Sequence, residues 1–208
     1  MLISTSFLSS NNIPKDLKKL NETSTDYIHV DVMDGKFVPN KTMPFREMKN
    51  IYKYTSKRLD VHLMVKDPKK CIDDYATLNT EYITIHEELT DNVENYLKQI
   101  KSYGIKAGLA IKPDTKVSNL VPYLPFIDLI LVMSVEPGQG GQKFIEDTPK
   151  KIDEIKVLLK EYKSNIVVSV DGGINNETSK LCKKCDILVS GSYIINSSNF
   201  EEKINSLR

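Results

Sequence analysis

The stretch Tyr27-Ile28-His29-Val30-Asp31-Val32-Met33-Asp34-Gly35 is a short apolar segment interrupted by polar side chains at alternate positions. Side chains in a β-strand repeat every two residues, so His29 and Asp31 would project from the same face. An imidazole and a carboxylate on a buried face need a partner, because an unpaired buried charge is strongly destabilising. The stretch therefore predicts a buried strand, and a divalent metal ion is the most economical partner for its polar groups.

Similar apolar, β-branched segments recur along the chain, and helix-like patterns lie between them. The candidate strands are Leu2–Phe7, Tyr27–Val32, Arg58–Val65, Tyr82–His86, Lys106–Ile111, Leu129–Ser134, Ile166–Val170 and Ile187–Ser190. The candidate helices are Pro14–Asn21, Phe45–Thr55, Pro68–Leu78, Thr90–Tyr103, Lys116–Leu124, Thr148–Tyr162, Asn176–Lys184 and Asn199–Leu207, and Lys143–Ile145 would begin the long sixth connection.

These strands read as continuous apolar runs, which suits strands buried on both faces of a parallel sheet. Eight strands alternating with eight helices predict an α/β protein with a single (β/α)₈ TIM barrel over residues 1–208, with a doubly wound sheet as the alternative. No change of composition and no linker rich in proline or serine divides the chain. We therefore expect one catalytic domain.

The composition excludes several classes of partner. The 29 Lys and Arg residues balance 28 Asp and Glu residues in a chain of 208, which argues against a nucleic-acid or membrane surface. No apolar run approaches the roughly 18 residues that span a bilayer. Met1-Leu2-Ile3-Ser4 leads directly into a strand-like segment, so we expect no signal peptide and a cytoplasmic protein.

The three cysteines do not by themselves indicate a metal site. Cys182 and Cys185 have the spacing of a redox pair or of half a zinc site, but a zinc ribbon needs a second pair. A structural role in a helix that leads into an apolar strand is the better interpretation for both.

Polar residues collect at the carboxyl ends of the predicted strands, where barrel enzymes build their active sites. Two histidines and two carboxylates among them form a ligand set that suits Zn²⁺, Fe²⁺, Mn²⁺ or Co²⁺. The alternative is that each is separately satisfied at its strand end. The strand-end residues are Ser6, His29, Asp31, His62, His86 and Asp171, of which His29, Asp31, His62 and Asp171 form the ligand set.

Glycines follow the last three predicted strands. The loops contain Pro137–Gln142, Asp171–Ile174 and Gly191-Ser192. Glycine lets backbone N–H groups approach an anion closely, and the loops after strands seven and eight are the recurrent phosphate site of these barrels. The sequence thus predicts a barrel of the phosphate-binding type, and its long polar sixth loop has the character of a mobile lid.

Two further features lie near the same strand ends. Met33, Met64 and Met133 would either fill the core or form an apolar wall that excludes water from a metal site. Asp34-Gly35 is typical of a hairpin turn, but the following residues are too proline-limited for a returning strand, so a loop over the barrel mouth is expected.

Together these motifs resemble the ribulose-phosphate 3-epimerase family, along essentially the whole chain. The segments that carry the resemblance are Ser6–Ser9, His29–Gly35, Phe37–Asn40, Asp60–Val65, Ile83–His86, Gly108–Pro113, Met133–Gly138, Val170–Ile174 and Ser190–Ser192.

The resemblance implies a metal-dependent isomerase that interconverts D-ribulose 5-phosphate and D-xylulose 5-phosphate in the pentose phosphate pathway. It implies one divalent ion, zinc first and Fe, Mn or Co as alternatives, held by His29, Asp31, His62 and Asp171. The implied substrate contacts are Ser6, His62, Gly138, Gln139, Gly140, Gly141, Gly172, Gly173, Gly191 and Ser192. Gln139 departs from the aromatic residue that many family members have in the sixth loop.

The implied mechanism uses two carboxylates. Removal of the proton at C3, next to the C2 carbonyl, becomes feasible when a metal ion stabilises the enediolate. Asp31 would act as the base and Asp171 as the acid in one direction, with the roles exchanged in the other. The expected partner is a small-molecule sugar phosphate, and whether the chain forms a homo-oligomer is left open.

Three other functions compete with this one. A sister 3-epimerase of a hexulose phosphate, such as D-allulose 6-phosphate, would use the same residues with a larger pocket. A metal-dependent aldolase or decarboxylase would want a catalytic lysine, for which Lys112 is the only candidate at a strand end. A non-catalytic sugar-phosphate binding protein would keep the fold without turnover.

Overall fold

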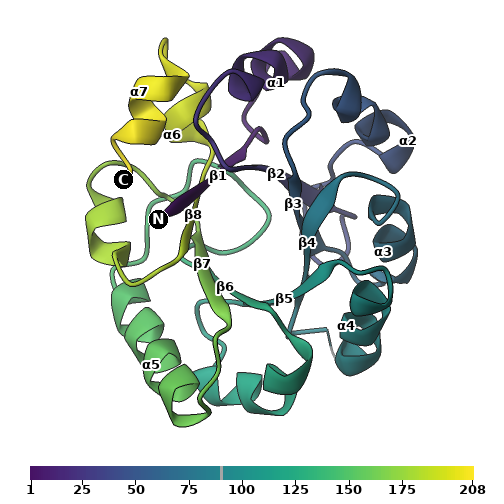
Figure 1. The fold of residues 1–208 in the computed structure, drawn as a ribbon, viewed down its shortest axis with the longest axis vertical. Coiled ribbons are helices and arrows are strands. Elements are labelled where there is room, and N and C mark those ends of the chain that lie inside the picture. Colours follow the sequence, from purple (N-terminus) through teal and green to yellow (C-terminus); the bar gives the residue numbers. More distant parts are fainter. Residues whose placement is uncertain (90) are drawn as a thin grey trace.

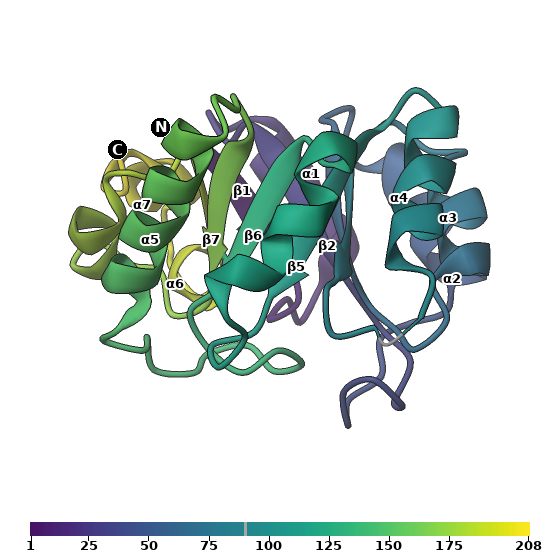
Figure 2. The ribbon, with the colours of Figure 1, turned by 90° about the horizontal axis from the view of Figure 1, so that it is seen from below.

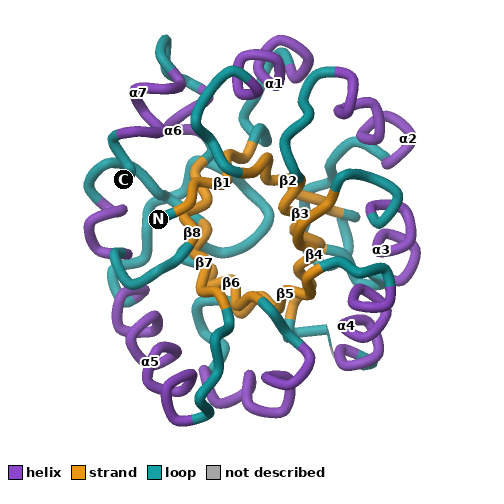
Figure 3. Tube along the Cα trace, viewed as in Figure 1, coloured by secondary structure: helices purple, strands orange, loops and turns teal. Residues whose placement is uncertain are grey.

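The computed structural model describes residues 1–89 and 91–208, and its centre is a closed barrel of parallel strands surrounded by helices (Figure 1; Figure 3). Each strand pairs with the next along the chain, and β1 closes the barrel against β8. The closure confirms the predicted (β/α)₈ barrel and excludes the open, doubly wound sheet. The strands are β1 Leu2–Ser6, β2 Tyr27–Met33, β3 Leu59–Met64, β4 Thr80–His86, β5 Lys106–Ile111, β6 Leu129–Met133, β7 Val167–Asp171 and β8 Ile187–Ser190.

The helices form the outer layer, and three of the connections contain 3₁₀-helices, labelled η. The α-helices are α1 Ile13–Asn21, α2 Phe45–Met48, α3 Lys69–Tyr75, α4 Val93–Ser102, α5 Thr148–Glu161, α6 Ser192–Ile195 and α7 Phe200–Asn205. The 3₁₀-helices are η1 Lys49–Lys53, η2 Val117–Phe126 and η3 Thr178–Cys182.

Three predicted helices are partly or wholly 3₁₀-helical instead of α-helical. In η2, Pro122 and Pro125 lack the N–H groups that an α-helix would use, so the chain keeps tight 3₁₀ turns. The short helix α6, which begins at Ser192, was not predicted, and Lys143–Ile145 is not helical. The predicted helix start at Thr90 lies outside the described residues.

The two faces of the barrel strands have different partners. Outward-facing side chains such as Val30, Val61 and Ile83 are fully buried in the main hydrophobic cluster, which includes buried residues of the surrounding helices. Cys182 and Cys185 belong to this cluster as free thiols, and burial raises the pKa of Cys182 to about 11. Both cysteines therefore have the surroundings of structural residues.

The inward-facing side chains are mostly apolar in one half of the barrel and mostly polar in the other half. A second hydrophobic cluster draws mainly on β6 and β8, with one residue each from β4 and β5. Strands β1 to β4 instead bring polar side chains into the buried interior. These are Ser4, Ser6, His29, Asp31, Asp60, His62, Thr84 and His86. Such a concentration of buried polar groups requires an extended hydrogen-bond network or a bound ion.

The loops after β2 and β6 extend from the same end of the barrel (Figure 2). They touch each other there, because the Asn40 side-chain amide donates a 2.7 Å hydrogen bond to the carbonyl oxygen of Gly138. Asp34 shapes the first of these loops by accepting hydrogen bonds from the N–H groups of Lys36, Phe37 and Lys66. Among the described residues, no helix has both the length and the apolar character needed to cross a bilayer.

Candidate active site

Strand register brings the polar residues of β2 and β3 together. Asp31 on β2 pairs with His62 on β3, and Met33 pairs with Met64 two residues further along. Asp171, the last residue of β7, pairs with Met133 on β6. Parallel strands end at the same side of a barrel, so side chains from distant parts of the sequence meet at its mouth.

Four of the predicted residues form one buried cluster. One nitrogen or oxygen atom from each of His29, Asp31, His62 and Asp171 lies within 4.8 Å of all the others. Asp31 Oδ1 is 3.4 Å from both His29 Nε2 and His62 Nδ1. Asp171 Oδ2 is 3.8 Å from the same two nitrogens. The four ligand atoms thus surround a common point.

The donor atoms fit a bound divalent cation. Among the described residues, four buried side-chain polar atoms lack a hydrogen-bond partner, and two of them are His29 Nε2 and His62 Nδ1. Ligand atoms that each lie about 2.0–2.1 Å from a tetrahedral zinc ion are about 3.4 Å apart. The spacing around Asp31 matches this value, and an ion would give both unpartnered nitrogens a bond. This group could therefore hold a metal ion.

The electrostatic environment shifts the pKa values of the two carboxyl groups in opposite directions. Burial raises the pKa of Asp171 to about 6, because the attraction of His29 offsets the loss of hydration only in part. Burial also favours the protonated form of Asp31, but the adjacent imidazole of His29 outweighs it and holds the pKa of Asp31 well below the usual range. Two carboxyl groups in one pocket therefore have opposite tendencies to bind a proton.

Hydrogen bonds fix the orientation of the ligands on β2. Ser6 Oγ donates to Asp31 Oδ2 at 2.7 Å and accepts the Leu8 N–H, which holds Ser6 at the mouth of β1. Asp60 Oδ2 lies 2.8 Å from His29 Nδ1 and accepts a hydrogen bond from Ser4 Oγ. Carboxylates commonly hold metal-binding histidines in this way.

Sequence reasoning did not single out Asp60 as a supporting residue. The signal was present, because Asp60 and His62 alternate on β3 in the same way that His29 and Asp31 alternate on β2. The third histidine, His86, lies outside the group that could hold a metal ion. Its Nε2 atom is instead 2.8 Å from His62 Nε2, so His86 contacts one of the candidate ligands directly.

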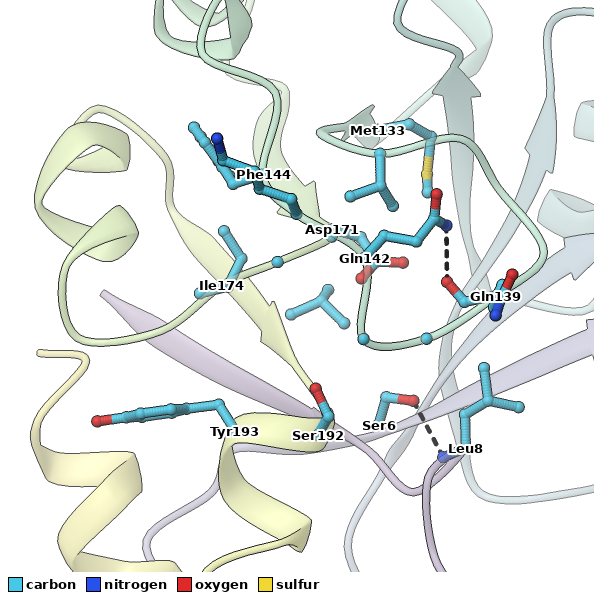
Figure 4. Close-up of a pocket in the computed structure, with 18 of the residues that line it drawn as sticks. Ser6, Leu8, Met133, Gln139, Gln142, Phe144, Asp171, Ile174, Ser192 and Tyr193 are labelled. Carbon is cyan, nitrogen blue, oxygen red and sulfur yellow. Dashed lines mark hydrogen bonds between the residues drawn. The ribbon is translucent and has the colours of Figure 1, made fainter.

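A cavity of about 790 Å³ opens above the cluster, between the ends of the strands and the loops after β1, β6, β7 and β8 (Figure 4). Asp31 and Asp171 reach its surface, whereas His29 and His62 are not among the lining residues. The predicted contact between His62 and the substrate therefore stays a prediction. The other predicted residues line the cavity: Ser6, Met33, Met64, Met133, Gly138, Gln139, Gly140, Gly141, Gly172, Gly173, Gly191 and Ser192.

The glycines at the end of β7 satisfy a steric requirement. Gly172 has a φ of +123°, which L-residues rarely adopt, and a Cβ atom there would lie 2.5 Å from Val135 Cγ2. Met33 and Met64 cluster with Val38 beneath the cavity, and Met133 belongs to the second hydrophobic cluster. The methionines thus serve both as core residues and as cavity wall.

Comparisons with known proteins agree with the geometry. The model of the ribulose-phosphate 3 epimerase family matches residues 2–195. A ribulose-phosphate 3-epimerase from Buchnera aphidicola is 41% identical, with 100% of this chain and 94% of the relative covered. The enzyme of that name from Bacillus subtilis is 35% identical, with 100% and 95% covered.

Solved structures resemble the chain in fold. A 3-hexulose-6-phosphate synthase has a TM-score of 0.74 at 12% identity, over 100% of this chain and 98% of that one. A tryptophan synthase structure from Mycobacterium tuberculosis has a TM-score of 0.71 at 15% identity, over 99% and 90%. Identities this low show the barrel fold alone. The family match and the curated relatives show more, namely that this chain belongs to the ribulose-phosphate 3-epimerase family and is an epimerase, an enzyme of the isomerase class.

Proposed function

We propose that the enzyme epimerises D-ribulose 5-phosphate and D-xylulose 5-phosphate at C3, as a step of the pentose phosphate pathway. The observation that carries this proposal is the pair of carboxylates, Asp31 and Asp171, that reach one cavity from the separate strands β2 and β7 beside two buried imidazoles. The relatives that carry the name ribulose-phosphate 3-epimerase support the choice of a pentulose phosphate.

We propose His29, Asp31, His62 and Asp171 as the ligands of one divalent ion. Two imidazole nitrogens and two carboxylate oxygens suit zinc, with Fe²⁺, Mn²⁺ and Co²⁺ as alternatives. When bound, such an ion supplies Lewis-acid stabilisation of the charge that develops on the C2 carbonyl oxygen. Met33, Met64 and Met133 line this end of the cavity beside the buried imidazoles, and we propose that these methionines restrict the access of water.

The two carboxylates move the proton. In one direction Asp31 removes the C3 proton, and Asp171 delivers a proton to the opposite face of the same carbon. In the other direction the roles are exchanged. Ser6 holds Asp31 in place through its 2.7 Å hydrogen bond, so the base keeps a fixed orientation relative to the substrate.

The phosphate group would lie against the backbone after β7 and β8. Gly172 and Gly173 have positive φ angles, and Gly191 and Ser192 line the same side of the cavity. Backbone N–H groups in such glycine loops can approach an anion closely. Anchoring the phosphate there would fix the position of C3 relative to the carboxylates.

The loop after β6 closes the cavity on the opposite side. Gln142 Nε2 donates hydrogen bonds to the carbonyl oxygens of Glu136 and Gln139, which folds the loop upon itself. Figure 4 shows the bond to Gln139. Gln139 lines the cavity from this loop. We propose that the loop acts as a lid held by its contact with the loop after β2.

The Gly138→Ala variant tests this contact between the loops. Gly138 has a φ of +111°, and a Cβ atom there would lie 2.7 Å from Val38 Cβ. We expect a loss of about 1–3 kcal/mol in the free energy of unfolding, as for other residues forced into rare backbone conformations. The KM for the sugar phosphate should rise, because the lid no longer packs against the loop after β2.

Gly104→Ala is the matched control, since Gly104 also has a positive φ but nothing lies within 4 Å of its Cβ position. Its unfolding free energy should fall from backbone strain alone, with an unchanged KM. Equal effects of the two variants on KM would contradict the role of the contact.

A hexulose-phosphate 3-epimerase is the second candidate, since it would use the same carboxylates. Steady-state kinetics on D-ribulose 5-phosphate and D-allulose 6-phosphate separate the two, and we expect a higher kcat/KM for the pentulose. A higher kcat/KM for the hexulose would overturn our choice of substrate. Absence of turnover on both by metal-replete protein would instead support a non-catalytic sugar-phosphate binding protein.

The aldolase or decarboxylase interpretation gains no support from the structure. Lys112 does not line the main cavity, and its ammonium lies 4.7 Å from the centre of the Phe37 ring. The cytoplasmic location stays a prediction from the sequence, and the oligomeric state stays open.

A further inference from the structure

The two histidines of the cluster are held in different ways. His29 Nδ1 lies directly against the carboxylate of Asp60, at 2.8 Å. His62 Nε2 lies against a second imidazole, His86 Nε2, also at 2.8 Å. Two facing imidazole nitrogens form a hydrogen bond only if one carries a proton and the other has a lone pair. The pair alone does not decide which of the two is the donor.

The contact between Glu88 and His86 decides which nitrogen of His86 carries the proton. Its Oε2 atom is 2.9 Å from His86 Nδ1. Its other oxygen, Oε1, accepts hydrogen bonds from the Lys112 N–H and from the Thr115 hydroxyl. An ionised carboxylate only accepts hydrogen bonds. His86 therefore has to present an N–H group at Nδ1.

A neutral ring has one N–H group, so His86 Nε2 carries a lone pair and has to accept the hydrogen bond from His62. His62 in turn has to carry its proton on Nε2. This leaves the lone pair of His62 on Nδ1, the atom that lies 3.4 Å from Asp31 Oδ1 and has no hydrogen-bond partner. The ligand nitrogen thus points into the cluster in the protonation form that a cation requires.

We propose that Glu88 and His86 are positioning residues that set the tautomer of His62 and so prepare it as a metal ligand. The proposal rests on the metal site proposed above, but the tautomer itself exists whether or not a metal is bound. His86 and Glu88 do for His62 what Asp60 does directly for His29.

We call the chain of hydrogen bonds from Glu88 through His86 to His62 the histidine relay. The surroundings of Glu88 and His86 keep this relay in place. His86 is fully buried between two rings, with centroid separations of 5.0 Å to His62 and 4.8 Å to Phe37. Lys151 Nζ donates hydrogen bonds to the carbonyl oxygens of Lys112 and Thr115, which ties down the loop that holds Glu88. A rigid relay preserves one hydrogen-bond direction through both rings.

The Glu88→Gln variant tests the relay because the two side chains have the same shape. A carboxamide can donate to His86 Nδ1, which would reverse both hydrogen bonds and place the proton of His62 on Nδ1. The chain has 3 histidines, so ¹⁵N-histidine labelling gives three resolvable rings. Long-range ¹H–¹⁵N correlation spectra of the metal-free protein then distinguish protonated from unprotonated ring nitrogens.

In the wild-type protein we expect protons on His62 Nε2 and on His86 Nδ1. In Glu88→Gln, His62 should shift toward the Nδ1–H form while the protonation of His29 stays the same as in the wild-type protein, because Asp60 is unchanged. The Zn²⁺ or Co²⁺ affinity, measured by competition with a chelator, should fall by about 10–100-fold, as for other changes in the groups that support metal ligands.

Glu87→Gln is the matched control, because Glu87 is the neighbouring carboxylate and hydrogen-bonds to Asn119 on the surface. It should leave the tautomers and the metal affinity unchanged. If Glu88→Gln fails to fold, His86→Phe provides a second test and should leave His62 as a mixture of tautomers with weakened metal binding.

Three outcomes would overturn the relay: a His62 proton on Nδ1 in the wild-type protein, a doubly protonated His86, or an unchanged His62 tautomer in Glu88→Gln. Failure of the proposed metal site gives a different result. The wild-type protein would then show the expected tautomers but bind neither Zn²⁺ nor Co²⁺ in the chelator competition.

Discussion

The Asp171→Asn variant is expected to lose about 10²- to 10⁴-fold in the rate of epimerisation, the range typical of a missing general acid or base. Asparagine keeps an oxygen atom near His29 and His62 but cannot deliver a proton to C3. The assay uses D-ribulose 5-phosphate with excess metal ion, and the bound metal is measured by elemental analysis. The loss of turnover is then assigned to proton transfer at full metal loading.

Isotope exchange makes this prediction specific. In deuterated water, Asp31 should still exchange the C3 proton of the epimer that it deprotonates, without inversion of the carbon. The other epimer should show no exchange. Asp153→Asn, a matched change on the exposed face of α5, should leave both the turnover and the exchange unchanged. Near-normal epimerisation by metal-loaded Asp171→Asn would show that the two-carboxylate scheme is wrong.

The Asp31→Asn variant is expected to lose both metal affinity and turnover. Asp31 Oδ1 is 3.4 Å from both histidine nitrogens, so its negative charge contributes to the ligand set and its oxygen to proton transfer. Turnover at saturating metal should fall by at least the roughly 10²- to 10⁴-fold expected for Asp171→Asn. Chelator competition measures the affinity, and steady-state kinetics at saturating metal measures the turnover.

Ser6→Ala provides the comparison for Asp31. It removes the hydrogen bond to Asp31 Oδ2 and keeps the carboxylate, so metal binding should persist with a smaller loss of turnover. If Asp31→Asn bound the metal as tightly as the wild-type protein, Asp31 would act in proton transfer alone. The dual role proposed for this residue would then be incorrect.

The candidate cluster could be predicted from the sequence for two reasons. Strand periodicity is visible within a few residues, and the convergence of strand ends is common to all barrels of this type. The alternation of His29 and Asp31 follows from the sequence of β2, and the position of Asp171 at a strand end follows from the apolar run before it. Barrel closure then brings these ends together. The same reasoning placed the glycine loops at the mouth.

The supporting hydrogen bonds could not be predicted in the same way. Glu88 lies just beyond the end of β4, and its orientation toward His86 is supported by the loop after β5, with Lys112 and Thr115 as donors. Such contacts depend on loop conformations that no periodicity encodes. The 3₁₀ turns of η2 similarly depend on the spacing of Pro122 and Pro125 within an apolar segment.

The most direct test of the account is the formation of D-xylulose 5-phosphate from D-ribulose 5-phosphate by protein stripped of metal, before and after add-back of one equivalent of a divalent ion. We predict no product from the stripped protein and recovery of turnover on addition of Zn²⁺, Co²⁺, Mn²⁺ or Fe²⁺, saturating at one ion per chain. Full turnover by the metal-free protein, or no turnover with any of these ions bound at His29, Asp31, His62 and Asp171, would contradict it.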